Sequence, residues 1–196
     1  RFFMNAYGFE PDFENLKITL LGGRGYRVPN IEFLVCREIM AQFLGRTQLT
    51  VAGEVEFYYQ AGYDYAITSC GLIDVAGVHN QNSVTAEKQQ DLSRGRRVWA
   101  EEHTGVIQTL ADIDSYPWPD PETMDYSDFL DKARYLKPGM KLISVLGKIF
   151  TTAWQLFGFE KFSEMLYDNP NLVNGLISRI ADLQERILKK VVQMDF

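Results

Sequence analysis

Apolar residues recur along this chain with helical spacing in several segments, most of which end at glycine or just before proline. These predicted helices cover 13–23, 37–46, 51–62, 126–136, 149–158, 159–169 and 170–195. The last pattern is the strongest, because Asp168 or Asn169 precedes Pro170 as a helix cap would. Its apolar stripe consists of Leu172, Leu176, Ile180, Leu183, Ile187 and Val191.

Short continuous apolar runs between these helices predict buried β-strands. They read IEFLV at 31–35, YDYAIT at 63–68 and MKLISVLG at 140–147. Apolar strands that alternate with helices are typical of a parallel sheet built from βα units. An eight-stranded barrel needs roughly 250 residues, so this pattern predicts an α/β chain that forms the front part of a larger fold.

The segment 71–121 shows neither the helical spacing nor the continuous apolar runs of the rest of the chain, so it is predicted to be an irregular insertion. A small hairpin or an extended layer is predicted around 99–109. It ends in DSYPWPDP at 114–121, which proline makes stiff and extended. Alone, this stretch is typical of a proline-rich ligand for a partner's aromatic groove. Between an insertion and a helix, however, it favours a clamp in which Tyr116 and Trp118 anchor the chain.

Composition narrows the class of protein. A hydrophobic content of 46% in 196 residues predicts one packed domain over 1–196. The net charge of −6 argues against nucleic acid as a partner. No apolar run is long enough for a membrane span, and the two cysteines, Cys36 and Cys70, lack metal-like spacing. A cytoplasmic protein without a membrane partner is therefore expected.

Six separated motifs share a family resemblance. They are RVPNIEF, AGYDYA, EEHTGVIQ, SYPWPDP, LKPGMKLISVLGKIF and WQLFGFEKFSEMLYDNPNLV. Together they resemble the uroporphyrinogen decarboxylase superfamily, and more closely its branch related to corrinoid-dependent methyltransferases. The match runs from about residue 13 to the end. The resemblance implies the N-terminal part of a (β/α)₈ TIM-type barrel with several extra helices, whose active site lies at the carboxyl ends of the strands.

The resemblance implies two chemistries, and the residues favour one of them. Decarboxylases of the family hold their substrate's carboxylates with an arginine-rich stretch after the first strand, whereas here IEFLV follows Arg27. Gly71 stands where an aspartate is expected, and Trp154 or Gln155 where a tyrosine is expected. Methyl transfer involving a corrinoid carrier is therefore the leading prediction. The alternatives are a lyase acting on a porphyrinogen-like substrate and a non-catalytic fragment that assembles with a partner.

The methyltransferase branch resembles zinc–thiolate enzymes, in which zinc lowers the pKa of an acceptor thiol that attacks a cobalt-bound methyl group. This chain has no His-x-Cys, so no metal ligand and no bound cofactor are expected in it. Zinc and a corrinoid carrier are expected only for a full-length relative. The expected partners are a small-molecule or corrinoid-protein substrate and a second copy of the chain, since an open parallel sheet exposes its edges.

No catalytic residue is assigned, but several side chains are predicted to bind substrate. Glu32 falls in the first predicted strand, where it either faces a ligand or pairs with Arg27 or Lys148. The remaining candidates follow the second and third strands at the height where barrel enzymes place ligand contacts. The alternative role is packing for Thr68, Ser69, Phe150 and Trp154, and for Lys148 an exposed position on the rim. The complete predicted set is Glu32, Thr68, Ser69, Lys148, Phe150 and Trp154.

Overall fold

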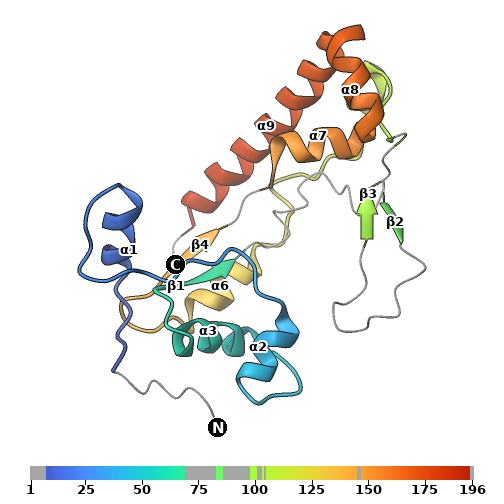
Figure 1. The fold of residues 1–196 in the computed structure, drawn as a ribbon. Coiled ribbons are helices and arrows are strands. Elements are labelled where there is room, and N and C mark those ends of the chain that lie inside the picture. Colours follow the sequence, from blue (N-terminus) through green and yellow to red (C-terminus); the bar gives the residue numbers. More distant parts are fainter. Residues whose placement is uncertain are drawn as a thin grey trace. The chain divides into compact units, whose positions relative to one another are not determined.

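The computed structural model describes residues 8–68, 83–85, 98–100, 103, 105–144 and 147–194. The chain divides into two compact units, coloured along the sequence in Figure 1. The first unit combines Arg1–Cys70 with Asp125–Val145 and Phe196, and the second combines Gly71–Met124 with Leu146–Asp195. A single domain over 1–196 with an insertion at 71–121 stays a prediction.

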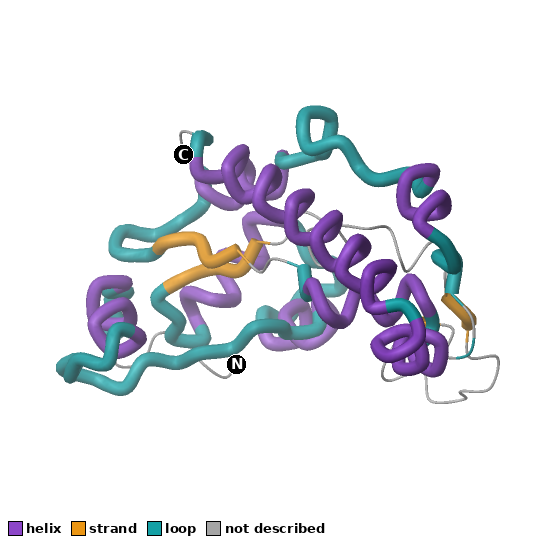
Figure 2. Tube along the Cα trace, turned by 90° about the horizontal axis from the view of Figure 1, so that it is seen from above, coloured by secondary structure: helices purple, strands orange, loops and turns teal. Residues whose placement is uncertain are grey.

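The first unit contains a parallel pair of strands, β1 (Tyr65–Thr68) and β4 (Lys141–Ser144). Tyr65 lies opposite Lys141 and Thr68 opposite Ser144, so the carboxyl ends of both strands meet at one edge. Figure 2 shows the two strands side by side in orange. This pair confirms the predicted α/β class with a parallel sheet, and it confirms the strands predicted within 63–68 and 140–147.

Four helices accompany this sheet. They are α1 (Phe13–Leu20), α2 (Arg37–Phe43), α3 (Val51–Gln60) and α6 (Ser127–Ala133). Helices α3 and α6 pack against β1 and against each other, and α6 also packs against β4. Side-chain caps explain two of the starts, because Asp12 accepts hydrogen bonds from the first turn of α1 and Thr50 from Gly53 in α3.

The predicted strand at 31–35 is wrong: this segment is irregular backbone in the structure. Phe33 is 67% exposed and Leu34 is 73% exposed, and of the apolar residues of this run only the half-buried Val35 packs against the core of the first unit. The hydroxyl of Tyr65 accepts the N–H of Glu32 and donates to its C=O, both at 2.7 Å. A side chain thus satisfies backbone groups that a neighbouring strand would pair in a sheet.

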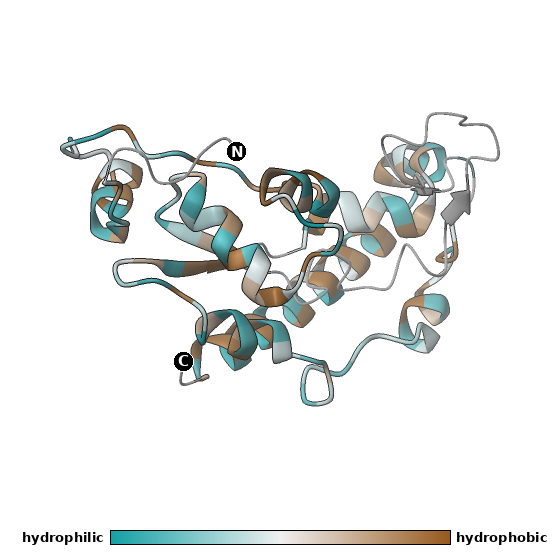
Figure 3. Cartoon of the chain, turned by 90° about the horizontal axis from the view of Figure 1, so that it is seen from below, coloured by the Kyte–Doolittle hydropathy of each residue, from teal (hydrophilic) through white to brown (hydrophobic). Residues whose placement is uncertain are grey.

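The second unit is mainly helical. The helices that its described residues form are α5 (Leu110–Ser115), α7 (Ile149–Phe157), α8 (Phe159–Asp168) and α9 (Pro170–Val192). Two short strands, β2 (Ser83–Thr85) and β3 (Val98–Ala100), pair antiparallel. Helix α9 packs against α5, α7 and α8. Figure 3 shows the mixture of brown apolar and teal polar residues along these helices, as expected for helices that bury one face.

The start and the apolar face of α9 confirm the strongest sequence pattern. The side chain of Asn169 accepts a hydrogen bond from Leu172 N–H, and Pro170 occupies the first turn. Val191 is half-buried. The other five members of the predicted stripe are buried, namely Leu172, Leu176, Ile180, Leu183 and Ile187.

The proline-rich segment 116–122, called the strap below, lies along the surface of α9. Its two rings lie 4.7 Å apart, and Tyr116 is buried in the core of this unit. Contacts to α9 continue along the strap: Trp118 with Arg179, Asp120 with Arg186 and Glu122 with Lys190. The predicted anchoring by the rings is confirmed. The expectation that all of 114–121 is non-helical is wrong, because α5 extends through Ser115.

The indole of Trp118 donates a 2.7 Å hydrogen bond to the carbonyl of Ile113. We expect Trp118→Phe to lower the free energy of unfolding by about 1 kcal/mol more than Trp154→Phe does, because Phe keeps much of the ring but loses the donor. Trp154 is a matched control, since it is also half-buried in this unit. Urea denaturation followed by circular dichroism measures both, and equal losses would contradict the role of this hydrogen bond.

Candidate functional site

The carboxyl edge of the β1–β4 pair is where parallel α/β proteins place ligands, and hydroxyl groups gather there. Thr68 is fully buried and donates a 2.6 Å hydrogen bond to Asp128 Oδ2. The hydroxyl oxygen of its strand neighbour Ser144 is buried, and within the described ranges it has no hydrogen-bond partner. A buried polar atom in this state points to a group that the described residues do not supply.

A buried charged network supports this edge from the helical layer. Lys132 is 6% exposed, and its ammonium group lies 2.9 Å from Glu54 Oε2 and 3.0 Å from Asp128 Oδ2. It also donates to the carbonyl of Ile67 at 2.9 Å. These contacts use all three donors of the ammonium group. Arg37 pairs with the other oxygen of Glu54.

This network determines which groups the edge can offer to a ligand. The charges of Lys132 and Arg37 are balanced by Glu54 and Asp128, so the cluster is neutral. Asp128 accepts a hydrogen bond from the Thr68 hydroxyl and also pairs with Lys132, so its carboxylate is already engaged. The edge is therefore suited to neutral polar groups and not to a substrate with several carboxylates, which needs unpaired cations.

The charged residues of this network are absent from the predicted site, although the sequence carries two signals for them. Asp128 and Lys132 stand four residues apart on a predicted helix, the spacing of a helical ion pair. Glu54 interrupts the apolar face of VAGEVEFYY. A charge on a buried face needs a partner, and here Lys132 supplies it.

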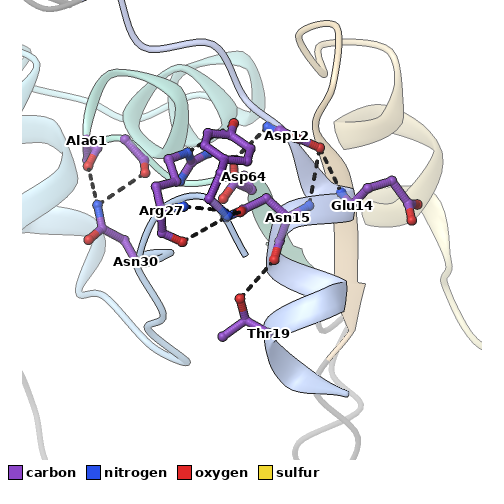
Figure 4. Close-up of polar contacts among 10 residues, drawn as sticks. Asp12, Glu14, Asn15, Thr19, Arg27, Asn30, Ala61 and Asp64 are labelled. Atoms are coloured by element: carbon purple, nitrogen blue, oxygen red, sulfur yellow. Dashed lines mark hydrogen bonds and ion pairs between the residues drawn. The ribbon is translucent and has the colours of Figure 1, made fainter. Parts of the chain in front are cut away.

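A second polar cluster lies at the opposite, amino end of β1 (Figure 4). Asp64 is fully buried, and its Oδ1 accepts the N–H of Asp12 at 2.7 Å and pairs with Arg27. Asn15 bonds the backbone of Tyr26 and Arg27 through its side chain. These contacts connect the start of α1 and the backbone at 26–27 to the start of β1.

The structure places Glu32 beside the amino end of β1, because its backbone bonds the hydroxyl of Tyr65, the first residue of that strand. Its exposed carboxylate accepts the N–H groups of Phe33 and Leu34, at 2.9 and 3.4 Å. The predicted position within a strand is wrong, and so is the alternative pair with Arg27, which binds Asp64 instead. Substrate binding by Glu32 stays a prediction.

The other predicted site residues divide between the two units. Thr68 belongs to the first unit, and Ser69 lies outside the described residues. In the second unit Lys148 is exposed immediately before α7, and Phe150 is exposed with its ring 5.3 Å from that of Phe162. Trp154 packs against the buried core of this unit. Their substrate contacts stay predictions.

Three tyrosines of the first unit, Tyr58, Tyr63 and Tyr65, form edge-to-face and tilted ring contacts with centroids 5.5 to 6.1 Å apart. Burial raises the pKa of each hydroxyl above the usual 10.0, and neighbouring tyrosines add to this effect for Tyr58 and Tyr65. A raised folded-state pKa stabilises the fold below pH 10.0, and this contribution is lost as the unfolded chain ionises at higher pH.

We therefore expect the free energy of unfolding to fall as the pH rises above 10.0, the usual pKa of tyrosine, with Tyr58 the largest single contributor. Tyr58→Phe removes one ionising group, so the fall should be smaller than in the parent chain. Tyr167→Phe is the control, because Tyr167 is 88% exposed. Urea titrations between about pH 8 and 11 test this, and parallel curves for Tyr58→Phe and the parent would contradict it.

A protein site for a metal ion such as zinc requires several ligating side chains close together. In the described part of the chain, no three His, Cys, Asp or Glu side chains are grouped so that they could hold one. These residues therefore do not fit the zinc ion of a zinc–thiolate enzyme, and no step is assigned to it. Separately, none of the helices over the same ranges combines the length and apolar character that crossing a bilayer requires.

The described geometry defines an α/β protein with a parallel strand pair and a hydroxyl-lined carboxyl edge. No family model matches the chain. Part of it is similar to uroporphyrinogen decarboxylases of Pseudomonas aeruginosa and Pseudomonas paraeruginosa, with 33% identity over 86 residues, which is 39% of this chain and 24% of each relative. The chain thus spans about a quarter of the length of these curated relatives. This similarity supports a relation to the uroporphyrinogen decarboxylase superfamily.

Proposed function

We propose that this chain is part of a (β/α)₈ barrel of the uroporphyrinogen decarboxylase superfamily and that the carboxyl edge of β1 and β4 contributes to its active site. The parallel register that places Thr68 beside Ser144 carries the proposal. The segment between the two strands includes α6, which packs against both of them, as a helix in a βα unit does. The partial similarity to uroporphyrinogen decarboxylases supports the same scaffold.

Within this superfamily we propose methyl transfer involving a corrinoid carrier as the reaction class. The support is electrostatic: Lys132, the buried cation nearest the edge, already has Glu54 and Asp128 as partners. A porphyrinogen with several carboxylates would have to find its cations elsewhere. The buried hydroxyl of Ser144, which has no hydrogen-bond partner among the described residues, suits a neutral amide group at the rim of a corrinoid. The cytoplasmic location and the self-association expected from the sequence belong to this proposal.

A direct binding comparison tests the reaction class with the chain as it is. Methylcobalamin and uroporphyrin are titrated separately into the purified chain, and intrinsic tryptophan fluorescence is corrected for absorption by each ligand. We expect saturable quenching by methylcobalamin that weakens about tenfold in Ser144→Ala, which removes the buried hydroxyl that has no partner among the described residues. Lys17→Met, an exposed change in the same unit, serves as the control and should bind as the parent does.

Decarboxylation is the second candidate, and it is favoured by the partial similarity to uroporphyrinogen decarboxylases. Saturable binding of uroporphyrin without binding of methylcobalamin would replace methyl transfer with this reaction. Binding of neither ligand would overturn the proposal that this edge forms part of either active site. The third alternative, a fragment that assembles with a partner, would then be supported by sedimentation of the chain as a defined oligomer.

A further inference from the structure

We propose that the loop 23–29 of the first unit is a binding site for a small oxyanion, either a phosphate or a carboxylate group. Together with Thr19 this loop lines a pocket of about 370 Å³. The pocket adjoins the amino end of β1 through the pair between Arg27 and Asp64. It is therefore separate from the carboxyl edge described above, and the proposal does not rest on the reaction class.

The shape of the loop is determined by buried contacts before any ligand arrives. Asn15 is 2% exposed, and its side-chain oxygen accepts the N–H of Tyr26 at 2.9 Å while its amide group donates to Arg27 C=O at 3.1 Å. A Cβ atom at Gly25 would overlap the side chain of Asn15, so glycine is required there. A loop held in one shape loses little conformational entropy on binding.

Arg27 is fixed in place but retains hydrogen-bonding capacity. One terminal nitrogen pairs with Asp64, Nε donates to the hydroxyl of Tyr26 at 3.4 Å, and the guanidinium group lies 4.9 Å from the centre of the Phe9 ring. Its second terminal nitrogen makes no hydrogen bond within the described ranges, although Arg27 lines the pocket. That nitrogen presents two N–H donors to a ligand.

The charge balance of the pocket favours an anion. Its charged lining residues are both arginines, Arg24 and Arg27. Asp64 compensates one of them, whereas Arg24 is exposed and forms no ion pair with any residue that the structure describes. One positive charge thus remains unbalanced. The planar guanidinium fork matches the oxygens of carboxylate and phosphate groups, which is why we assign an oxyanion.

The test uses ¹H–¹⁵N NMR of the whole chain, titrated with inorganic phosphate or with acetate at constant ionic strength. We expect saturable shifts of the backbone amides of Gly23, Gly25 and Tyr26, with a Kd on the order of 1 mM for the preferred anion. Arg24→Gln should weaken binding about tenfold, as expected for the loss of a charged hydrogen bond. Saturation by phosphate alone assigns a phosphoryl ligand, and saturation by acetate alone assigns a carboxylate.

Arg46→Gln is the matched control, because Arg46 is an exposed arginine in the same unit that lies outside the pocket lining. It removes the same charge and should leave the Kd unchanged. Shifts that rise linearly with anion concentration, or a Kd that Arg24→Gln does not change, would overturn the site. An equal loss in both variants would also overturn it, since this would show attraction to net charge only.

Discussion

Replacing Lys132 with methionine is expected to lower the free energy of unfolding by about 3–5 kcal/mol, the range seen when one partner of a buried ion pair is removed. The ammonium group is the shared partner of Glu54 and Asp128, and the Glu54 side chain is only 8% exposed. Methionine fills a similar volume but supplies no charge and no donor, so Asp128 would lose its ion-pair partner and Glu54 would keep only Arg37 among the described residues. Urea denaturation followed by circular dichroism measures the loss.

Lys17→Met is the control for this substitution, because it removes a lysine whose pair with Glu14 is exposed at the surface of the same unit. It should cost no more than about 1 kcal/mol. If uncompensated charge causes the larger loss, adding Glu54→Gln to Lys132→Met should recover part of the stability. Similar costs for Lys132→Met and Lys17→Met would show that the network contributes little.

Gly139→Ala is expected to cost about 3 kcal/mol or more, because two penalties coincide at this position. Gly139 has a φ of +84°, a conformation that residues with a side chain rarely adopt, and its added Cβ would overlap the carbonyl oxygen of Pro11. Its own carbonyl accepts the N–H of Phe13 at 3.0 Å. Moving the turn to admit alanine would therefore weaken the start of α1 as well.

Gly22→Ala separates the two penalties, because Gly22 has nearly the same φ, +83°, with nothing close to its Cβ position. This control should cost about 1 kcal/mol, the price of the backbone conformation alone. Thermal or urea denaturation compares the two variants. Equal losses would mean that the backbone near Pro11 shifts freely, and the packing explanation for Gly139 would fail.

Local patterns were sufficient to predict most of the regular elements. The cap at Asn169, the proline after it and the apolar stripe predicted α9, because all of these signals lie within one continuous segment. The short apolar runs likewise predicted β1 and β4. The glycine in the family-like motif PGMK also has a structural reason, since only glycine fits the close approach of the turn to Pro11.

What the sequence could not reveal depends on partners distant along the chain. The run at 31–35 has the composition of a strand, yet in the first unit its backbone at Glu32 is paired by the Tyr65 hydroxyl, which no local pattern records. The network at the carboxyl edge joins Glu54 to Lys132 from helices far apart in sequence. The four-residue spacing predicts the pair of Asp128 and Lys132, whereas the contact between Lys132 and Glu54 can be recognised only in the folded structure.

The strap has a consequence for the order in which the chain acquires structure. Asp120 and Glu122 find their partners on α9 only 66 and 68 residues later. A ribosome adds about 5–20 residues per second, so several seconds pass between the synthesis of the strap and the synthesis of the α9 residues that it contacts. Tyr116 and Trp118 then lack the cover that α9 gives them in the folded unit. Docking of the strap on α9 is therefore a late step in the folding of the second unit during synthesis.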